Sequence, residues 1–450
     1  MPPSRSPKIE YVDEPHYRQA YHQALVYKTI AGAQPDTLVH TVEALLGMME
    51  QVARFTRGIK QINYLYGWQY DGSDTGYPAF DKVNPRLKRA GDASAADSVA
   101  WLMAEAKQRL DAEVSVHINL CDAYEDSPLW DEYVREDLLC RDPNGHLEKA
   151  GVWEGRQSYH VCKSREWAAG YTRRRIDAML EALPLAAAGT IHVDVFNMHP
   201  SAWHGTTFAD EVKAMIEILR YFRARGIDVT REWFDHEFAG LTPWALHFNL
   251  DEHSRLKYPP SVVCGGGSGW NRRHKTRADQ IAWSGSFLTP EGGCLYEEAW
   301  GESIDCSSPD QPDFAEKFYT RTLPWYFLNR QRALELRHTP EMYAVHFTGD
   351  VVSAVRQADR HYTLRQGDRL LVDGGDLFVP ALWREKEIIA YTRKGCRREW
   401  ELPPDWSGVG RVAVHALWPP GPERVTERRA VHGRIMLELQ PNEAVYLAPA

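Results

Sequence analysis

The stretch from Gly189 to Phe238 constrains the fold more than any other part of this chain. It opens with GTIHVDVFNMHPSAWHG and closes with GIDVTREWFDHEF. In the opening segment, apolar Ile191 and Val193 alternate with His192 and Asp194, which is the period of a β-strand. In the closing segment, IDVTREWF has the length of a second strand. The stretch therefore predicts two strands with a connection between them.

The connection TTFADEVKAMIEILRYFRAR has the period of an amphipathic helix, because its apolar residues recur every three or four positions from Phe208 to Phe222. Thr207 followed by Asp210 is a candidate N-terminal cap, and Gly226 is a candidate stop. A crossover of this kind joins parallel strands and brings their C-terminal ends to one edge of the sheet. The spacing therefore predicts a β-α-β unit with an acidic residue near the end of each strand.

Asp194 and Glu232 are those two acidic residues, and paired carboxylates at a sheet edge suit glycoside hydrolysis. Asp194 is the candidate nucleophile, because its polar neighbours favour the ionised form. Glu232 is the candidate general acid, because apolar surroundings such as Trp233 raise the pKa of a carboxyl group. The structural alternative is that each acid caps a helix or pairs with an arginine such as Arg231.

Strands and helices alternate on both sides of this unit. The expected helices and strands before it include a helix over 38–57, a strand in KQINYLYGW, a helix over 95–110, a strand in EVSVHINLCDAY and a helix over 166–183. Residues 125–163 interrupt the series as an insertion. Polar, Asp-rich segments follow the strands, as in (β/α)8 barrels, whereas no GxGxxG or GKS/T motif is present. The pattern predicts an α/β fold with a TIM-like (β/α)8 barrel, possibly distorted.

Beyond about residue 340 the pattern changes to short runs rich in β-branched residues, separated by DGG, PPDWSG and PPGP. That texture predicts an appended antiparallel β-sandwich. We therefore expect an N-terminal arm over 1–35, a catalytic barrel over 36–340 and a C-terminal β-sandwich over 341–450.

Composition narrows the classes of partner. The net charge of −9 is spread along the chain, which disfavours nucleic acid and anionic membranes as partners. The start lacks a signal-peptide pattern, and the seven cysteines form no CxxC pair, so we expect a cytoplasmic location. The 16 tryptophans and 21 tyrosines are frequent in predicted loops, as in YLYGWQYDG, and aromatic rings suit the apolar face of a sugar. A carbohydrate is the expected partner.

A metal hydrolase is the rival chemistry for the same stretch. His192 and Asp194 share one strand face, and His199 and His204 follow closely. Histidines with a carboxylate can hold zinc. HExxH is absent, however, and most such histidines only form hydrogen bonds, so we expect neither a metal nor a cofactor. The glycine-rich segment CGGGSG is expected to be a loop at the edge of the site.

Four motifs in matching order resemble glycoside hydrolase family 101, the endo-α-N-acetylgalactosaminidases, and the related family 129. GWQYDGSDTGYP is similar to the family's GWQ-x-x-GHDS-x-P segment, and SVHINLCDAY resembles its strand with an HIN core. IHVDVF resembles the strand that carries the family nucleophile, and TREWF the segment with its general acid/base. The resemblance covers roughly residues 60 to 240.

The resemblance implies a distorted (β/α)8 barrel and a retaining mechanism on α-linked N-acetylgalactosamine (GalNAc) in O-glycans or glycopeptides. It makes Asp194 the nucleophile and Glu232 the acid/base. The residues expected to bind the sugar are Trp68, Gln69, Asp74, His117, Asn119, Tyr124 and Trp233. Ser73 stands where the family has a histidine, which affects the expected specificity. The alternatives are an α-galactosidase or another α-glycosidase on the same scaffold, and a non-catalytic carbohydrate-binding protein.

Overall fold

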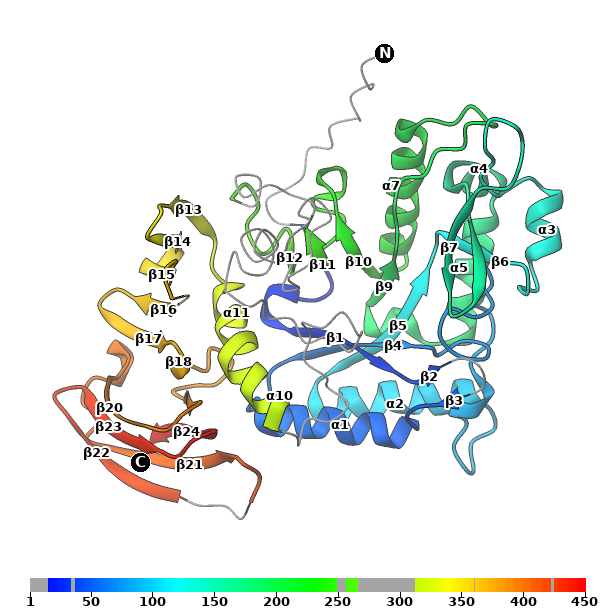
Figure 1. The fold of residues 1–450 in the computed structure, drawn as a ribbon. Coiled ribbons are helices and arrows are strands. Elements are labelled where there is room, and N and C mark those ends of the chain that lie inside the picture. The colour runs from blue at the N-terminus through cyan, green and yellow to red at the C-terminus, as the bar shows by residue number, and fades with distance from the viewer. Residues whose placement is uncertain (1–14, 34–36, 249–255, 266–311, 360, 422–424) are drawn as a thin grey trace.

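The computed structural model describes residues 15–33, 37–248, 256–265, 312–359, 361–421 and 425–450. A curled, wholly parallel sheet forms one part of the molecule, and an antiparallel sheet forms the C-terminal part (Figure 1). The order of the parallel strands is β1 (Leu25–Ile30), β4 (Gln61–Tyr66), β5 (Glu113–Asn119), β9 (Thr190–Asp194), β10 (Asp228–Phe234), β11 (Trp244–Phe248) and β12 (Cys264–Gly265). The predicted α/β class is confirmed.

Helices cover the outer face of the parallel sheet, with α1 and α2 lying beneath β1 and β4 in Figure 1. The helices before β10 are α1 (Val42–Phe55), α2 (Ala95–Leu110), α3 (Trp130–Arg135), α4 (Lys163–Ala169), α5 (Tyr171–Ala182), α6 (Leu185–Ala188) and α7 (Phe208–Ala224). The predicted capping box of α7 is confirmed, because the side chains and backbone amides of Thr207 and Asp210 bond reciprocally.

The helix expected over 166–183 is two helices. Gly170 lies between α4 and α5 with φ of 86°, a left-handed conformation that ends α4 and that glycine adopts without steric cost. Two strands of the insertion, β8 (Arg156–His160) and β7 (Lys149–Trp153), form a small antiparallel sheet with β6 (Asp122–Tyr124), which precedes the insertion.

Residues 25–30 differ from the expected extended arm, because they form the edge strand β1, paired in parallel with β4. Every residue of β1 before Ile30 is buried, including Lys28. Two short strands, β2 (Gly32–Ala33) and β3 (Thr37–Leu38), then form a ladder of their own. Closure of the sheet into an eight-stranded barrel remains an expectation. The glycine-rich segment from residue 266 onward lies outside the described residues.

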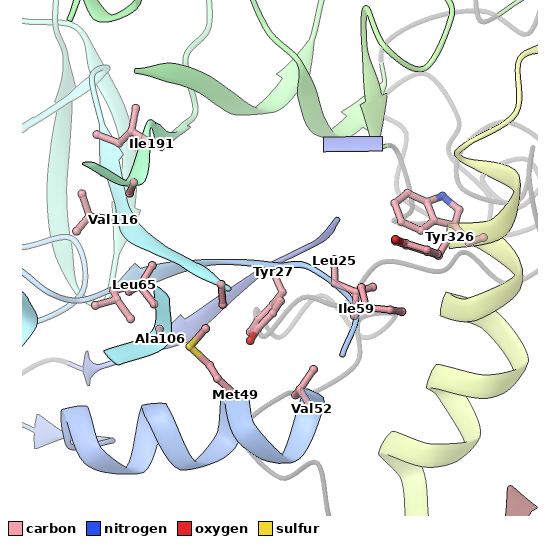
Figure 2. Close-up of a cluster of buried hydrophobic side chains, with 14 of the residues drawn as sticks. Leu25, Tyr27, Met49, Val52, Ile59, Leu65, Ala106, Val116, Ile191 and Tyr326 are labelled. Atoms are coloured by element: carbon pink, nitrogen blue, oxygen red, sulfur yellow. The ribbon is translucent and has the colours of Figure 1, made fainter. Parts of the chain in front are cut away.

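Side chains that alternate along β1 enter two different cores. Leu25 and Tyr27 point toward α1, where they join the main core with Met49 and Val52 (Figure 2). Val26 belongs to a separate cluster, which the curled sheet encloses and which also includes Ile62, Tyr64, Trp244 and Leu246. The parallel sheet is therefore packed on both faces, as parallel sheets generally are.

The C-terminal part is one twelve-stranded antiparallel sheet. Its strands are β13 (Ala333–His338), β14 (Met342–Phe347), β15 (Val351–Arg356), β16 (His361–Gln366), β17 (Arg369–Asp373), β18 (Asp376–Pro380), β19 (Ile388–Thr392), β20 (Cys396–Glu401), β21 (Arg411–Trp418), β22 (Val425–Val431), β23 (Arg434–Leu439) and β24 (Glu443–Pro449). Phe378 of β18 stacks on Trp400 of β20 with ring centroids 5.2 Å apart, although β20 lies at the far edge of the sheet. The sheet therefore folds over itself around a core.

The segment that leads into this sheet comprises α10 (Pro312–Lys317), a π-helical turn (Phe318–Thr322) and α11 (Leu323–Leu328). The two parts of the molecule meet at the end of α1. Arg57 forms a bidentate ion pair with Glu387, with both N···O distances 2.9 Å, and the Trp383 indole nitrogen donates to the Thr56 carbonyl at 3.0 Å. None of the helices in the described ranges is long and apolar enough to cross a membrane.

The chain before β1 is attached to the N-terminal end of the parallel sheet through Asp228. Its carboxylate accepts the backbone amides of Arg18 at 2.7 Å and Gln19 at 3.3 Å. Burial raises the pKa of Asp228 to about 6, although these two amides and Arg223 act in the opposite direction.

We predict that Asp228 makes the fold less stable as the pH rises through 6. The pKa of an aspartate in an unfolded chain is about 4, so the folded state binds the proton more tightly and loses stability on ionisation, by at most about 3 kcal/mol. Asp228→Asn keeps one acceptor oxygen and should lack this loss. Urea unfolding at pH 5 and pH 7.5 measures the difference, and an identical pH dependence for both proteins would contradict the prediction.

Candidate active site

Strand register brings the two candidate catalytic acids together. Asn119 of β5 pairs with Asp194 of β9, and Val193 of β9 pairs with Arg231 of β10. Glu232 is one residue past that last pair and is therefore at the level of Asp194. Side chains two residues apart share a sheet face. The side chains of Asn119, Asp194 and Glu232 thus lie on the enclosed face at the C-terminal edge, with His117 and His192 one level below.

Val195 connects the two acids through its backbone. Its amide donates to Glu232 Oε2 at 3.2 Å, so the Glu232 carboxylate reaches the residue next to Asp194. Val195 has φ of 48°, in the left-handed region that β-branched residues rarely adopt. Its carbonyl accepts the Cys121 thiol at 2.6 Å and the Asn197 amide at 2.5 Å. Strained backbone of this kind is concentrated at functional sites.

Lys28 is a site residue that the sequence reading missed. Its side chain is 2% exposed, and Nζ lies 3.2 Å from His117 Nδ1 and 3.9 Å from Asp194 Oδ1. A buried ammonium beside a carboxylate stabilises the ionised carboxylate. The available signal was a charged residue in the middle of the apolar run LVYKTI, which is unusual unless the charge is paired.

The loop after β4 contributes Asp74 and Tyr77. The Tyr66 hydroxyl donates to Asp74 Oδ2 at 3.3 Å. Burial raises the pKa of the Tyr77 phenol well above its ordinary value, and the negative charges of Asp74 and Asp194 raise it further. Burial and the charge of Asp74 act in the same direction on the pKa of Tyr124. The Tyr124 backbone amide donates to the Tyr77 carbonyl at 3.1 Å, which joins the loop after β4 to β6.

Three of the predicted sugar-binding residues have structural partners. The Trp68 indole is fully buried in the core and donates to the His117 carbonyl at 2.8 Å. Asn119 accepts the amides of Cys121 and Asp122, and donates to the Asp122 carboxylate at 2.6 Å. Gln69 is buried and donates to the Thr75 carbonyl at 3.4 Å. These contacts fix the ends of β4 and β5.

Trp233 lies on the opposite face of β10 from Glu232, because successive strand residues alternate in direction. It is fully buried. The Trp233 side chain therefore does not supply the apolar surroundings that the sequence predicted for the Glu232 carboxyl group.

Ser73, the position that departs from the family pattern, faces the β7–β8 hairpin. Its hydroxyl donates to Glu154 Oε1 at 3.3 Å. The Arg156 guanidinium bonds to the Asp74 carbonyl and lies 4.4 Å from the Tyr124 ring centroid. The hairpin is therefore attached to the loop that carries Asp74.

Of the histidines considered as metal ligands, His192 lies beside Asp194, whereas His199 and His204 bond to other acids. His204 bonds to Asp137 at 2.8 Å, and His199 pairs with Glu148 at 3.1 Å. In the described part of the chain, His117, His192 and Asp194 form one cluster with ligand atoms within 4.8 Å of one another. The positive charge of Lys28 beside His117 and Asp194 opposes the binding of a divalent cation at this cluster. We therefore interpret His117 and Asp194 as partners of the lysine.

Burial strongly lowers the pKa of His117, and electrostatic interaction with Lys28 and His192 lowers it further. The His117 imidazole is therefore neutral at physiological pH. Its ring is held between Tyr66, in edge contact with centroids 4.7 Å apart, and His192, with centroids 5.6 Å apart.

We predict that position 195 reverses the usual stability order of glycine and alanine. Alanine at φ of 48° keeps the steric strain of Cβ, whereas glycine removes it. Val195→Gly should therefore be more stable to urea than Val195→Ala, by about 1 kcal/mol. Both variants lose the two γ-methyl groups and differ only in Cβ, so the comparison isolates the backbone strain that Cβ causes. Greater stability of the alanine variant would show that the turn carries no strain.

Comparisons with known proteins identify the family of the chain. A family model described as endo-α-N-acetylgalactosaminidase matches residues 20–257, which is more than half of the chain. A search of curated protein sequences finds no match.

Among solved structures, the chain is similar to the α-N-acetylgalactosaminidase NagBb from Bifidobacterium bifidum. The complex with GalNAc gives a TM-score of 0.56 at 14% identity, covering 77% of this chain and 57% of that one. The ligand-free form gives 0.55 at 14% identity, covering 76% and 57%. This chain thus spans little more than half the length of NagBb, and the likeness concerns the fold. By the match of the family model, the chain belongs to glycoside hydrolase family 101.

Proposed function

We propose that this protein is a retaining α-glycoside hydrolase that releases α-linked GalNAc from O-glycans or glycopeptides. One observation carries the proposal: the Val195 amide, next to Asp194, donates to the Glu232 carboxylate at 3.2 Å. Retaining enzymes need their two carboxyl groups only about 5–5.5 Å apart, whereas inverting enzymes leave room for a water between them. Membership of the family and the position of both acids at the C-terminal edge of the sheet support the same assignment.

In the first step, an Asp194 carboxylate oxygen attacks the anomeric carbon while Glu232 gives its proton to the leaving glycosidic oxygen. The products are a covalent glycosyl-enzyme and the free aglycone. In the second step, Glu232 takes a proton from water, whose oxygen attacks the anomeric carbon and releases Asp194. Two inversions give net retention. Lys28, 3.9 Å from Asp194 Oδ1, favours the ionised nucleophile.

The assignment of GalNAc rests on the family and on the motifs that carry the resemblance. Ser73 bears on specificity, because its hydroxyl replaces the family histidine and is directed to Glu154 at 3.3 Å. The contact that the family histidine makes to the sugar is then lost or changed, which keeps an α-galactoside as the second candidate substrate. A non-catalytic sugar-binding protein is the alternative outside enzymes.

We predict that the protein hydrolyses aryl α-GalNAc and releases the α-anomer first. A panel of aryl α- and β-glycosides of GalNAc and galactose, followed by NMR of the first product, measures both properties. Asp194→Asn should lower the turnover by roughly 10³- to 10⁵-fold, because loss of the nucleophile removes the covalent step. First release of the β-anomer would contradict the retaining mechanism, and binding without turnover would favour the sugar-binding alternative.

Azide should distinguish the roles of the two acids. In Glu232→Ala, azide can attack the glycosyl-enzyme and form the α-glycosyl azide, with restored turnover of an activated aryl substrate. In Asp194→Ala, azide replaces the nucleophile and gives the β-glycosyl azide. The configuration of each azide product, determined by NMR, checks the assignment. The opposite pair of products would exchange the roles of Asp194 and Glu232.

A further inference from the structure

Lys28 lies on β1, whereas the two acids lie on β9 and β10. At the candidate site, its Nζ is 3.2 Å from His117 Nδ1 and 3.9 Å from Asp194 Oδ1. Lys28 is also close to the Tyr66 ring, 5.3 Å from its centroid. Lys28 is therefore at hydrogen-bond distance from the His117 imidazole, and it forms an ion pair with the candidate nucleophile Asp194.

The contact with Lys28 determines which nitrogen of the His117 imidazole carries the proton. An ammonium group has hydrogens to donate and no lone pair, so Nδ1 of a neutral imidazole beside it must be the acceptor. The proton of the imidazole is then on Nε2, because which ring nitrogen carries it is set by the hydrogen bond that the other makes. His117 is neutral for the reasons given above, so it has a single N–H, and that N–H is at Nε2.

His117 Nε2 is buried, and it has no hydrogen-bond partner among the described residues. A buried N–H without a partner costs about 1–3 kcal/mol, which a ligand acceptor can remove. The ring cannot easily turn away, since Tyr66 and His192 contact its two sides and Trp68 holds its backbone carbonyl. The donor is therefore held in place at the level just below Asp194.

We propose that Lys28 is a positioning residue that fixes His117 as the Nε2–H tautomer, so that His117 donates a hydrogen bond to a hydroxyl oxygen of the sugar that Asp194 attacks. The same ammonium neutralises part of the charge of Asp194. This inference rests on the proposed glycosidase function. The family resemblance gives His117 a place beside the sugar, whereas the direction of its hydrogen bond follows from Lys28.

The first test reads the tautomer of the resting enzyme and needs no substrate. Long-range ¹H–¹⁵N NMR of histidine-labelled protein distinguishes a protonated ring nitrogen from an unprotonated one, and His117→Gln identifies the His117 signals. We expect Nε2 to be protonated and Nδ1 unprotonated. Protonation at Nδ1 would overturn the inference, even if Asp194 and Glu232 proved to be the catalytic acids.

The second test asks whether Lys28 acts through His117. Lys28→Met should lower kcat/KM about 10- to 100-fold, because the imidazole can then adopt the other tautomer and the nucleophile loses its counter-charge. His117→Gln carries a fixed side-chain N–H, so the same lysine substitution should cost several-fold less in that background. An equal loss in both backgrounds would overturn the inference.

Two controls make the outcome specific. Lys60→Met removes a lysine that pairs with Glu113 near the N-terminal end of the sheet, and it should leave kcat/KM unchanged. Lys28→Arg keeps a donor-only cation, and it should preserve the Nε2–H signal and recover part of the activity lost in Lys28→Met. Should Lys28→Met fail to fold, the wild-type NMR measurement and Lys28→Arg still decide between the two tautomers. Activity of Asp194→Asn equal to wild type would instead refute the proposed function.

Discussion

The register of β9 between β5 and β10 is the constraint on which the candidate site depends. It aligns Asn119, Asp194 and Glu232 at one level of the enclosed face. A slip of one residue would turn Asp194 away from that face, because strand side chains alternate. The register is fixed on both sides of the sheet: Ile191 and Val193 pack in the main core, while the His192 Nδ1 lies 2.9 Å from the Thr230 hydroxyl on the enclosed side. The buried strands thus position the acids.

Residues from several parts of the chain supply the charge and the strained backbone at the site. Lys28 on β1 supplies a buried positive charge beside the nucleophile. Val195 has a left-handed conformation. Its amide donates to Glu232, and its carbonyl accepts the Cys121 thiol. An enclosed setting of this kind strengthens electrostatic interactions, because little water screens them. The site therefore depends on long-range pairing of β1, β5, β9 and β10.

Local sequence predicted the β-α-β unit well, because the periods of its strands and helix and the capping box of α7 are properties of neighbouring residues. It also predicted the edge at which Asp194 and Glu232 lie. Lys28 was missed because the apolar run around it shows only that its charge is buried, whereas its partners His117 and Asp194 lie far along the chain on β5 and β9. The burial of Trp68 and the outward direction of Trp233 depend on which face of the sheet is enclosed. The residues of the motifs do not show which face that is, so the sequence could not predict either position.

The most direct test of the central claim, that Asp194 is the catalytic nucleophile, is to trap the covalent intermediate. A 5-fluoro α-glycosyl fluoride of GalNAc forms a glycosyl-enzyme faster than water can hydrolyse it, and peptide mass spectrometry locates the label. The account predicts one sugar per chain, attached to the peptide that contains Asp194, and no label in Asp194→Asn. Attachment to Glu232 or to another residue, or hydrolysis of a natural α-GalNAc substrate by an enzyme that never forms an adduct, would contradict it.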